Sequence, residues 1–249
     1  MFGRILVCCL AMAAFPAWAA DVVVLTPNPF APIFEELRTD FERATGDKIV
    51  LVRDTAGGVA NRIGKGEAFD IAVLGVAAAK KAAGDGKLAV GSDRPVGTSS
   101  VGLAVKDGAP IPKIDTVEAF KAVLLSARAV AYTDPASGGS SGIYLSQLWP
   151  KLGIAEQMKA KAVLVPGGLA AERIANGQAD VALQQAGELM SVKGARYVGL
   201  IPAEIQFVTS YAVGISAASA RAGSAKTLVD MLLGAKATEA MSHHGLARP

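Results

Sequence analysis

One sequence pattern occurs twice in the chain, first in residues 57–73 and again in residues 167–183. Each copy starts with Gly-Gly and continues through a helical stretch that contains Arg-Ile. It then reads Gly-Glu-Ala or Gly-Gln-Ala before an Asp and an apolar run. Such a run is typical of a buried strand, so each copy is one helix–strand unit. Two Ala-rich units can match by chance, but a true repeat predicts two similar α/β lobes, each with a Gly-Gly turn at a helix start.

The rest of the chain alternates in the same way between apolar, β-branched runs and amphipathic stretches. The expected strands are residues 22–25, 49–52, 70–74, 101–105, 130–132, 163–165, 181–183 and 208–215. The expected helices are residues 33–44, 59–64, 117–125, 143–152 and 225–233, and residues 242–249 are expected to form a frayed tail. Continuously apolar strands joined through helices predict parallel sheets covered on both faces, and therefore the α/β class.

Residues 1–19 are expected to be a secretory signal peptide that is cleaved after Ala19. Arg4 precedes an apolar run that is too short for the ~20 residues of a membrane span, and small residues stand before the cleavage point. A short buried helix is the alternative. Cys8 and Cys9 lie in this segment, so the mature chain is expected to have no disulfide and no thiolate ligand. No later apolar stretch is long enough to span a membrane, which predicts an exported protein of the periplasm.

Length and charge narrow the function classes. A chain of 249 residues suits one large domain or two lobes. The net charge of +3 is too small for a protein that neutralises phosphates along a nucleic-acid groove, so no nucleic-acid partner is expected. The composition is 51% hydrophobic but only 6% aromatic, and the predicted leader accounts for part of the apolar content.

Turns at the ends of predicted strands indicate an anion cleft. Each turn follows a strand and precedes a helix, where unpaired backbone N–H groups and the helix dipole favour negative charge. In open α/β sheets such turns at the carboxyl ends of strands are where ligands bind. None is followed by Gly-Lys-Ser/Thr, so none is a nucleotide phosphate loop. The turns are residues 26–29, 55–58, 137–142 and 166–168.

Several of these segments, in this order and spacing, resemble the periplasmic solute-binding proteins of ABC importers, in particular the molybdate-binding group. The matching segments are residues 22–28, 55–58, 66–71, 134–135, 141–144 and 177–181. The resemblance implies a bilobal type II periplasmic-binding-protein fold, with two doubly wound parallel-sheet lobes joined by a two-strand hinge. It places lobe I at residues 20–98 plus 205–249 and lobe II at residues 99–204, with crossings near Thr98 and Ile205. It further implies a monomer, a small anionic ligand, an ABC permease as partner, and no cofactor or metal.

The resemblance and the turns together define the candidate ligand-binding residues. In two places the chain departs from the molybdate-binding pattern: Asn28 stands where a small hydroxyl residue is expected, and Gln184-Gln185 where a Tyr is expected. Amides both donate and accept, so they suit a ligand of mixed polarity such as an organic carboxylate. Arg53 can clamp a carboxylate or be a solvated strand end. The candidates are Thr26, Asn28, Arg53, Thr55, Ala56, Gly57, Gly58, Ser140, Ser141, Gly167, Gly168, Gln184 and Gln185.

Two function classes stay open. The first is a binding protein that captures a small anion, an organic carboxylate or a molybdate-like oxyanion, for ABC-type import. The second is a periplasmic enzyme of the aconitate-isomerase type, whose 1,3-proton shift needs a base and donors that stabilise negative charge. The candidate bases are Asp54, Glu204 and Tyr211, which are otherwise a loop cap, a hinge-surface residue and a core residue. His243 and His244 are expected in the exposed tail rather than in a metal site.

Overall fold

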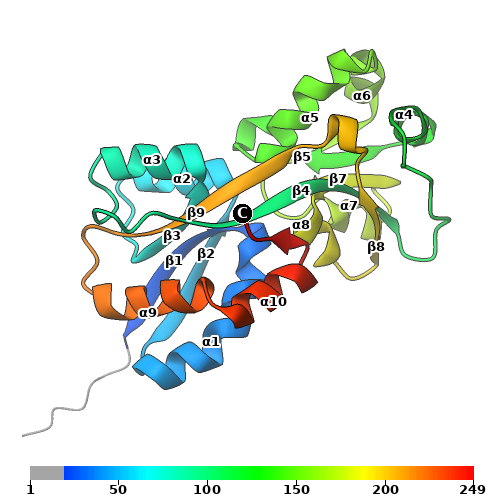
Figure 1. Ribbon diagram of the computed structural model, residues 1–249. Coiled ribbons are helices and arrows are strands. Elements are labelled where there is room, and N and C mark those ends of the chain that lie inside the picture. Colours follow the sequence, from blue (N-terminus) through cyan, green and yellow to red (C-terminus); the bar gives the residue numbers. More distant parts are fainter. Residues whose placement is uncertain (1–19) are drawn as a thin grey trace, which may run out of the picture.

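The strand β4 (Arg94–Lys106) runs from one half of the molecule into the other. In the computed structural model, which describes residues 20–249, β4 pairs with β9 (Val208–Ile215) through residues 94–100. From Val101 onward it pairs with β7 (Val181–Gln185) instead. The chain returns through residues 201–207, where Gln206 bonds both the N–H and the carbonyl of Val101. Figure 1 shows these two crossings between the halves.

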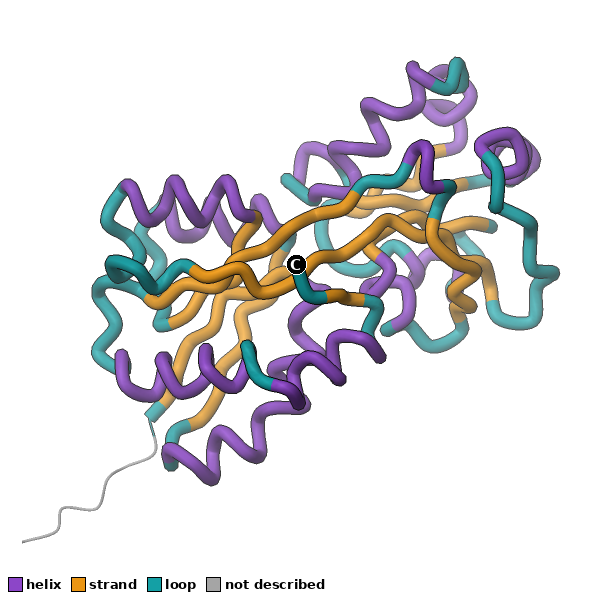
Figure 2. Tube along the Cα trace, viewed as in Figure 1, coloured by secondary structure: helices purple, strands orange, loops and turns teal. Residues whose placement is uncertain are grey.

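The first half is a sheet with the strand order β2-β1-β3-β9-β4. Its parallel strands are β2 (Lys48–Asp54), β1 (Asp21–Pro27) and β3 (Ile71–Gly75), and β9 and β4 add antiparallel pairs. Helices cover both faces (Figure 2). One face carries α1 (Ala31–Thr45), α9 (Ala222–Leu232) and α10 (Ala235–His243), and the other carries α2 (Ala56–Gly64) and α3 (Val76–Gly84).

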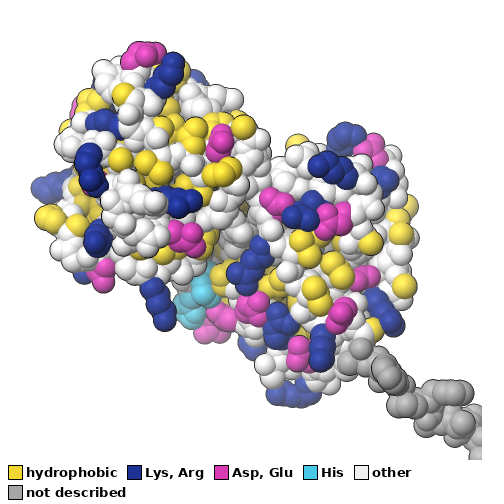
Figure 3. All heavy atoms as spheres, turned by 180° about the vertical axis from the view of Figure 1, so that it is seen from behind, with side chains coloured by type: hydrophobic (Ala, Val, Ile, Leu, Met, Phe, Trp, Pro, Cys, Tyr) yellow, Lys and Arg dark blue, Asp and Glu magenta, His cyan; other side chains and the backbone are white. Residues whose placement is uncertain are grey.

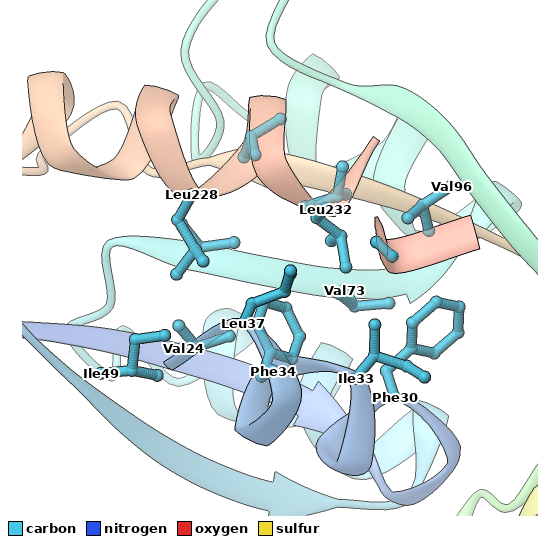
Figure 4. Packing of buried hydrophobic residues seen from close by; sticks show 14 of the residues in the cluster. Val24, Phe30, Ile33, Phe34, Leu37, Ile49, Val73, Val96, Leu228 and Leu232 are labelled. Atoms are coloured by element: carbon cyan, nitrogen blue, oxygen red, sulfur yellow. The ribbon is translucent and has the colours of Figure 1, made fainter. Parts of the chain in front are cut away.

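Alternate residues of the strands point to opposite faces, so each sheet face has its own apolar cluster. In the first half, Val24 packs under α1 and α9 with Phe34 and Leu228 (Figure 4), while its neighbour Leu25 packs with Val59 of α2 on the other face.

The second half repeats this plan with the order β4-β7-β5-β6. β5 (Val130–Thr133), β6 (Ala162–Val165) and β7 are parallel, and β8 (Ala195–Leu200) pairs with β4 on the side away from β7. The helices are α4 (Val117–Ser126), α5 (Ser140–Lys151), α6 (Ala155–Lys161), α7 (Ala171–Ala175) and α8 (Ala186–Met190). Short 3-10 turns are η1 (Asn28–Phe30), η2 (Pro135–Ser137) and η3 (Ala203–Ile205).

The expected α/β class with sheets covered on both faces is confirmed, and the crossing strands add antiparallel pairs to otherwise parallel sheets. The apolar clusters of the second half fall within residues 101–207, and those of the first half lie outside that range. The exact lobe boundaries at residues 98 and 205 stay a prediction. The predicted signal peptide with Arg4, Cys8 and Cys9 lies outside the described residues. No helix among residues 20–249 is long and apolar enough to cross a bilayer.

The Asp of the repeated sequence pattern makes equivalent hydrogen bonds in both halves. Asp70 exchanges two bonds with Val23 of the neighbouring strand start: its N–H donates to the Val23 carbonyl (2.9 Å) and its carboxylate accepts the Val23 N–H (2.8 Å). Asp180 acts likewise at the start of β5, accepting the Arg128 N–H (2.7 Å) and donating to the Ala129 carbonyl (3.0 Å). The Asp–strand part of the pattern is therefore shared by both halves. The Gly-Gly parts differ, because Gly57 and Gly58 lie inside α2 whereas Gly167 and Gly168 form a turn before α7.

The expected frayed tail at residues 242–249 is wrong. α10 extends to His243, and β10 (Leu246–Ala247) pairs with β4. Arg248 then donates to the carbonyls of Val96 (2.9 Å), Leu232 and Gly234 (both 3.0 Å), which ties the C-terminal end to the first half. Nothing in the local sequence marks residues 246–248 as ordered, because β10 and the Arg248 side chain bond residues at least ten positions away.

Candidate functional site

A small cavity lies between the two halves, where the carboxyl ends of four parallel strands meet. β1 and β2 reach it from the first half and β5 and β7 from the second, while β9 contributes Tyr211. Its volume is about 20 Å³, little more than one water needs, so the two halves are closed on each other. We call it the interlobe cavity. Its lining residues are Pro27, Asn28, Pro29, Asp54, Thr55, Ala56, Thr133, Gly139, Ser140, Ser141, Gln185, Glu188 and Tyr211.

Direct hydrogen bonds hold the two halves together beside the cavity. Thr55 caps the start of α2 by accepting the Gly58 N–H (2.9 Å), and its hydroxyl donates to the Ser137 carbonyl across the gap (2.6 Å). The Gly57 N–H donates to the Gly138 carbonyl (3.0 Å). A Cβ at Gly57 would lie 2.7 Å from the Gly138 oxygen, so only glycine permits this approach.

A buried polar network forms the floor of the cavity. The Gln185 amide donates to the hydroxyls of Thr209 (2.8 Å) and Ser140 (3.0 Å), which lie in different halves. The Tyr211 hydroxyl bonds to the same two hydroxyls. Its ring packs edge-on against Phe30, with ring centroids 5.1 Å apart. Burial, reinforced by the nearby Glu188 carboxylate, raises the pKa of Tyr211 well above its usual range, so this phenol is a hydrogen-bond donor and not a base.

Two buried polar atoms that line the cavity have no hydrogen-bond partner within the described residues 20–249. They are the Thr133 hydroxyl and the Gln185 carbonyl oxygen, and both residues are 2% exposed. Most buried polar groups in proteins are hydrogen-bonded, and each exception needs a cause. A polar ligand or water in the cavity would supply the missing partners.

Glu188 is a cavity residue that the sequence reasoning did not select. It is 7% exposed and stands in the first turn of α8, where its Oε2 accepts the Gln185 N–H (3.3 Å). Asn28 bonds the carboxyl from the first half. Burial raises the pKa of Glu188 to about 8. The available signal was a Gln-x-x-Glu pattern directly after a buried strand.

The structure brings part of the predicted ligand set to the cavity and leaves part outside its lining. Arg53 ion-pairs with Glu35 at 3.3 Å on the surface. Gln184 bonds the Gly168 carbonyl and the Ala170 N–H, so it supports its own loop. Those in the lining are Asn28, Thr55, Ala56, Ser140, Ser141 and Gln185. Those outside it are Thr26, Arg53, Gly57, Gly58, Gly167, Gly168 and Gln184.

The structure places two of the three predicted bases in the cavity lining and one outside it. Asp54 lines the cavity, but its carboxylate accepts the Arg62 Nε at 2.7 Å and the Thr55 N–H at 2.8 Å. Tyr211 is in the lining, whereas Glu204 is exposed on η3 and outside it.

The two histidines lie outside the cavity lining. His244 Nε2 lies 2.7 Å from Glu36, and His243 is exposed at the end of α10. Within residues 20–249 no three His, Cys, Asp or Glu side chains form a cluster that could hold a metal ion. Figure 3 shows acidic and basic side chains interspersed over the far face, with the His side chains at the waist between the halves.

A two-lobed α/β protein whose halves close on a cavity at their strand ends has the architecture of a type II periplasmic binding protein. The chain belongs to the bacterial extracellular solute-binding protein family, whose model it matches over residues 22–247. It is 32% identical over 247 residues to an aconitate isomerase of Pseudomonas sp., covering 95% of this chain and 93% of that protein.

Solved structures share the fold at lower identity. The periplasmic molybdate-binding protein of Azotobacter vinelandii superimposes with a TM-score of 0.75 at 19% identity, covering 92% of this chain and 99% of that one. The sulfate-binding protein SubI of Mycobacterium tuberculosis has a TM-score of 0.72 at 16% identity, covering 92% of this chain and 87% of that one. The expected resemblance to solute-binding proteins is thereby confirmed.

Proposed function

We propose that this protein captures a small organic carboxylate in the interlobe cavity and delivers it to an ABC-type permease. The observation that carries this proposal is the donor set: hydroxyl groups, an amide network and the start of α5 converge on the cavity. Among residues 20–249, no Lys or Arg is in the lining. An anion in such a site is held by hydrogen bonds and helix-end N–H groups and needs no ion pair.

The mixed polarity of the cavity lining favours an organic carboxylate as ligand over an oxyanion such as molybdate or sulfate. Asn28 and Gln185 offer amides that donate and accept, and Glu188 adds a carboxyl group. Molybdate and sulfate present acceptor oxygens alone at neutral pH, so an unpartnered acceptor such as the Gln185 oxygen would stay unpaired beside them. A hydroxylated or partly protonated carboxylate supplies the missing donor.

Capture requires the halves to separate, because the closed cavity is too small for a tricarboxylate to enter. The two crossing segments, residues 98–101 of β4 and residues 201–207, are the connections about which the halves would move.

We further propose that residues 1–19 export the chain to the periplasm and are removed after Ala19. Mass spectrometry of the exported protein tests this, and an N-terminus at Met1 would contradict it.

Thermal-shift measurements on residues 20–249 test the ligand class. The panel is molybdate, tungstate, sulfate, citrate, cis-aconitate and trans-aconitate, each at the same ionic strength. A ligand at 100 times its Kd adds about 2.7 kcal/mol to the free energy of unfolding, which raises Tm by several degrees. Stabilisation by one or more carboxylates is expected. Stabilisation by molybdate or tungstate alone would overturn the carboxylate proposal.

A second candidate, isomerisation of a bound tricarboxylate, is favoured by one observation: a buried carboxyl, Glu188, lies near Tyr211 in the cavity. The 32% identical relative is named an aconitate isomerase. A base would remove a proton from the methylene carbon next to the double bond. The electron pair would delocalise over three carbons, and the same proton or one from solvent would return to the far carbon.

This candidate has a direct test. Purified protein is incubated with trans-aconitate, and the reaction is followed by proton NMR. Appearance of cis-aconitate at a rate proportional to protein concentration, and its loss in Glu188→Gln, would establish turnover. Stabilisation without any isomer formation would leave the protein a binder.

A further inference from the structure

We propose that Glu188 meets the bound anion as a neutral carboxylic acid and donates a hydrogen bond to one of its oxygens. At any pH at which this carboxyl is ionised in the free protein, ligand capture is then accompanied by the uptake of one proton. The inference rests on the proposed function, since it concerns the ligand of the same cavity.

The environment of Glu188 carries the proposal. The carboxyl is buried at the junction of the two halves and lines the cavity, and its neighbours are the Asn28 amide and the Gln185 N–H. Within the part of the chain that the structure describes, no Lys, Arg or His side chain bonds it. An ionised carboxylate without a cation is expensive to bury, and such a group usually binds a proton instead. Burial accordingly raises the pKa of Glu188 to about 8.

Within residues 20–249, the titratable groups on the elements around α8 leave the Glu188 carboxyl without a bonded cation. The turn between α10 and β10 packs against Gly187, and its His244 ring pairs with Glu36 at 2.7 Å. β9 brings Tyr211, which stays neutral, and across the cavity Asp54 is held by Arg62. β8 brings Tyr197, which is partly buried, and the exposed Arg196, which ion-pairs with Asp107 at 3.0 Å. β7 carries no ionisable group. The charged residues of β4 are Arg94 and Lys106, both exposed at its ends, and η1 has none.

Binding of a carboxylate ligand would raise the pKa of Glu188 further. A carboxylate ligand in a cavity without basic residues would repel an ionised Glu188 and accept a hydrogen bond from a protonated one. The bound complex therefore holds the proton more tightly than the free protein does. Affinity is then constant well below the pKa of the free protein and falls by up to about tenfold per pH unit above it.

A purely structural role for Glu188, capping α8, is the competing explanation. Glutamine occupies the same capping-box position as glutamate, so Glu188→Gln keeps the cap while it removes the titration. Glu118→Gln is the matched control, because Glu118 also stands in the first turn of a helix but is exposed.

Two measurements test the inference. In the first, infrared spectra of ligand-free protein at pH 7 are compared with those of Glu188→Gln. The carbonyl stretch of a protonated carboxyl is expected in wild type and in Glu118→Gln, and it should be absent from Glu188→Gln. Identical spectra of all three proteins would overturn the proposal without any ligand being involved.

In the second, calorimetric titrations with citrate, cis-aconitate and trans-aconitate are run from pH 6.5 to 9.5. Wild type and Glu118→Gln are expected to lose about tenfold in affinity between pH 8.5 and 9.5, whereas Glu188→Gln changes less than about twofold. Parallel profiles for wild type and Glu188→Gln would overturn the inference and leave carboxylate capture standing. Absence of binding by all three carboxylates would instead overturn the proposed function, and the infrared result would then decide the protonation of Glu188 alone.

Discussion

Replacing Gly57 with alanine tests whether the closed contact between the halves is the ligand-bound arrangement. The new Cβ would lie 2.7 Å from the Gly138 oxygen and 2.8 Å from its Cα, distances that real Cβ atoms do not reach. Closure must then give up the hydrogen bond between the Gly57 N–H and the Gly138 carbonyl. Overpacking costs about 1–3 kcal/mol and the lost bond about 0.5–1.5 kcal/mol. Together these weaken binding by roughly 10- to 2,000-fold.

The matched control is Gly64→Ala in the same helix. Gly64 has nothing within 4 Å of its Cβ position. Alanine raises helix propensity by up to about 1 kcal/mol at either site. Parting of the halves relieves the Gly57→Ala clash without unfolding, so both variants should unfold about as late as wild type in urea. Affinity for the stabilising carboxylate, measured by calorimetry, should fall only in Gly57→Ala. Equal affinities for Gly57→Ala and Gly64→Ala would refute the idea that ligand is bound in this closed arrangement.

Three further outcomes concern stability. The pKa of Glu188 is raised on folding from 4.5 to about 8, so its contribution is full below pH 4.5 and is lost as pH rises to about 8. The Tm of Glu188→Gln minus the Tm of wild type should therefore increase between pH 5 and 8 in scanning calorimetry. A constant difference would contradict the argument that burial raises the pKa of Glu188. Arg248→Ala should cost about 1–3 kcal/mol in urea unfolding, because it removes partly buried bonds to three carbonyls. An unaffected midpoint would show that the C-terminal end is dispensable. Asp70→Ala should cost about 1–3 kcal/mol and Asp180→Ala less, since Asp180 is more exposed, and the reverse order would refute that reasoning.

Local chemistry explains which parts of the site were predictable. The turn at Thr55 has a residue that caps a helix and glycines that admit close approach, and these properties act within a few residues. Ser140 and Ser141 stand at the start of α5, directly after the Gly139 N-cap. Their presence in the cavity lining follows from the rule that ligands bind at the carboxyl ends of parallel strands, once the strands were placed correctly.

Long-range contacts explain what was missed. The tail residues 246–248 are ordered by pairing with β4 and by bonds to the carbonyls of Val96 and Leu232. Neither propensity nor periodicity encodes those partners. In the same way the turn at Gly167 has the composition of a binding loop, yet Gln184 holds its second glycine and the turn lies outside the cavity lining.

The repeat gives an independent reason to regard Glu188 as more than a helix cap. In the first half, α3 follows β3 directly, with Gly75 at its N-cap and Ala78 three residues on, and no side chain caps it. In the second half, α8 follows β7 in the same way, with Gln185 at the N-cap and Glu188 three residues on. Since α3 forms at this junction without any polar pair, the junction itself does not require a buried carboxyl. Burying one costs free energy that the first half avoids. Only the second half carries this cost, and its carboxyl lines the cavity. A carboxyl that is kept for contact with a ligand would show this pattern.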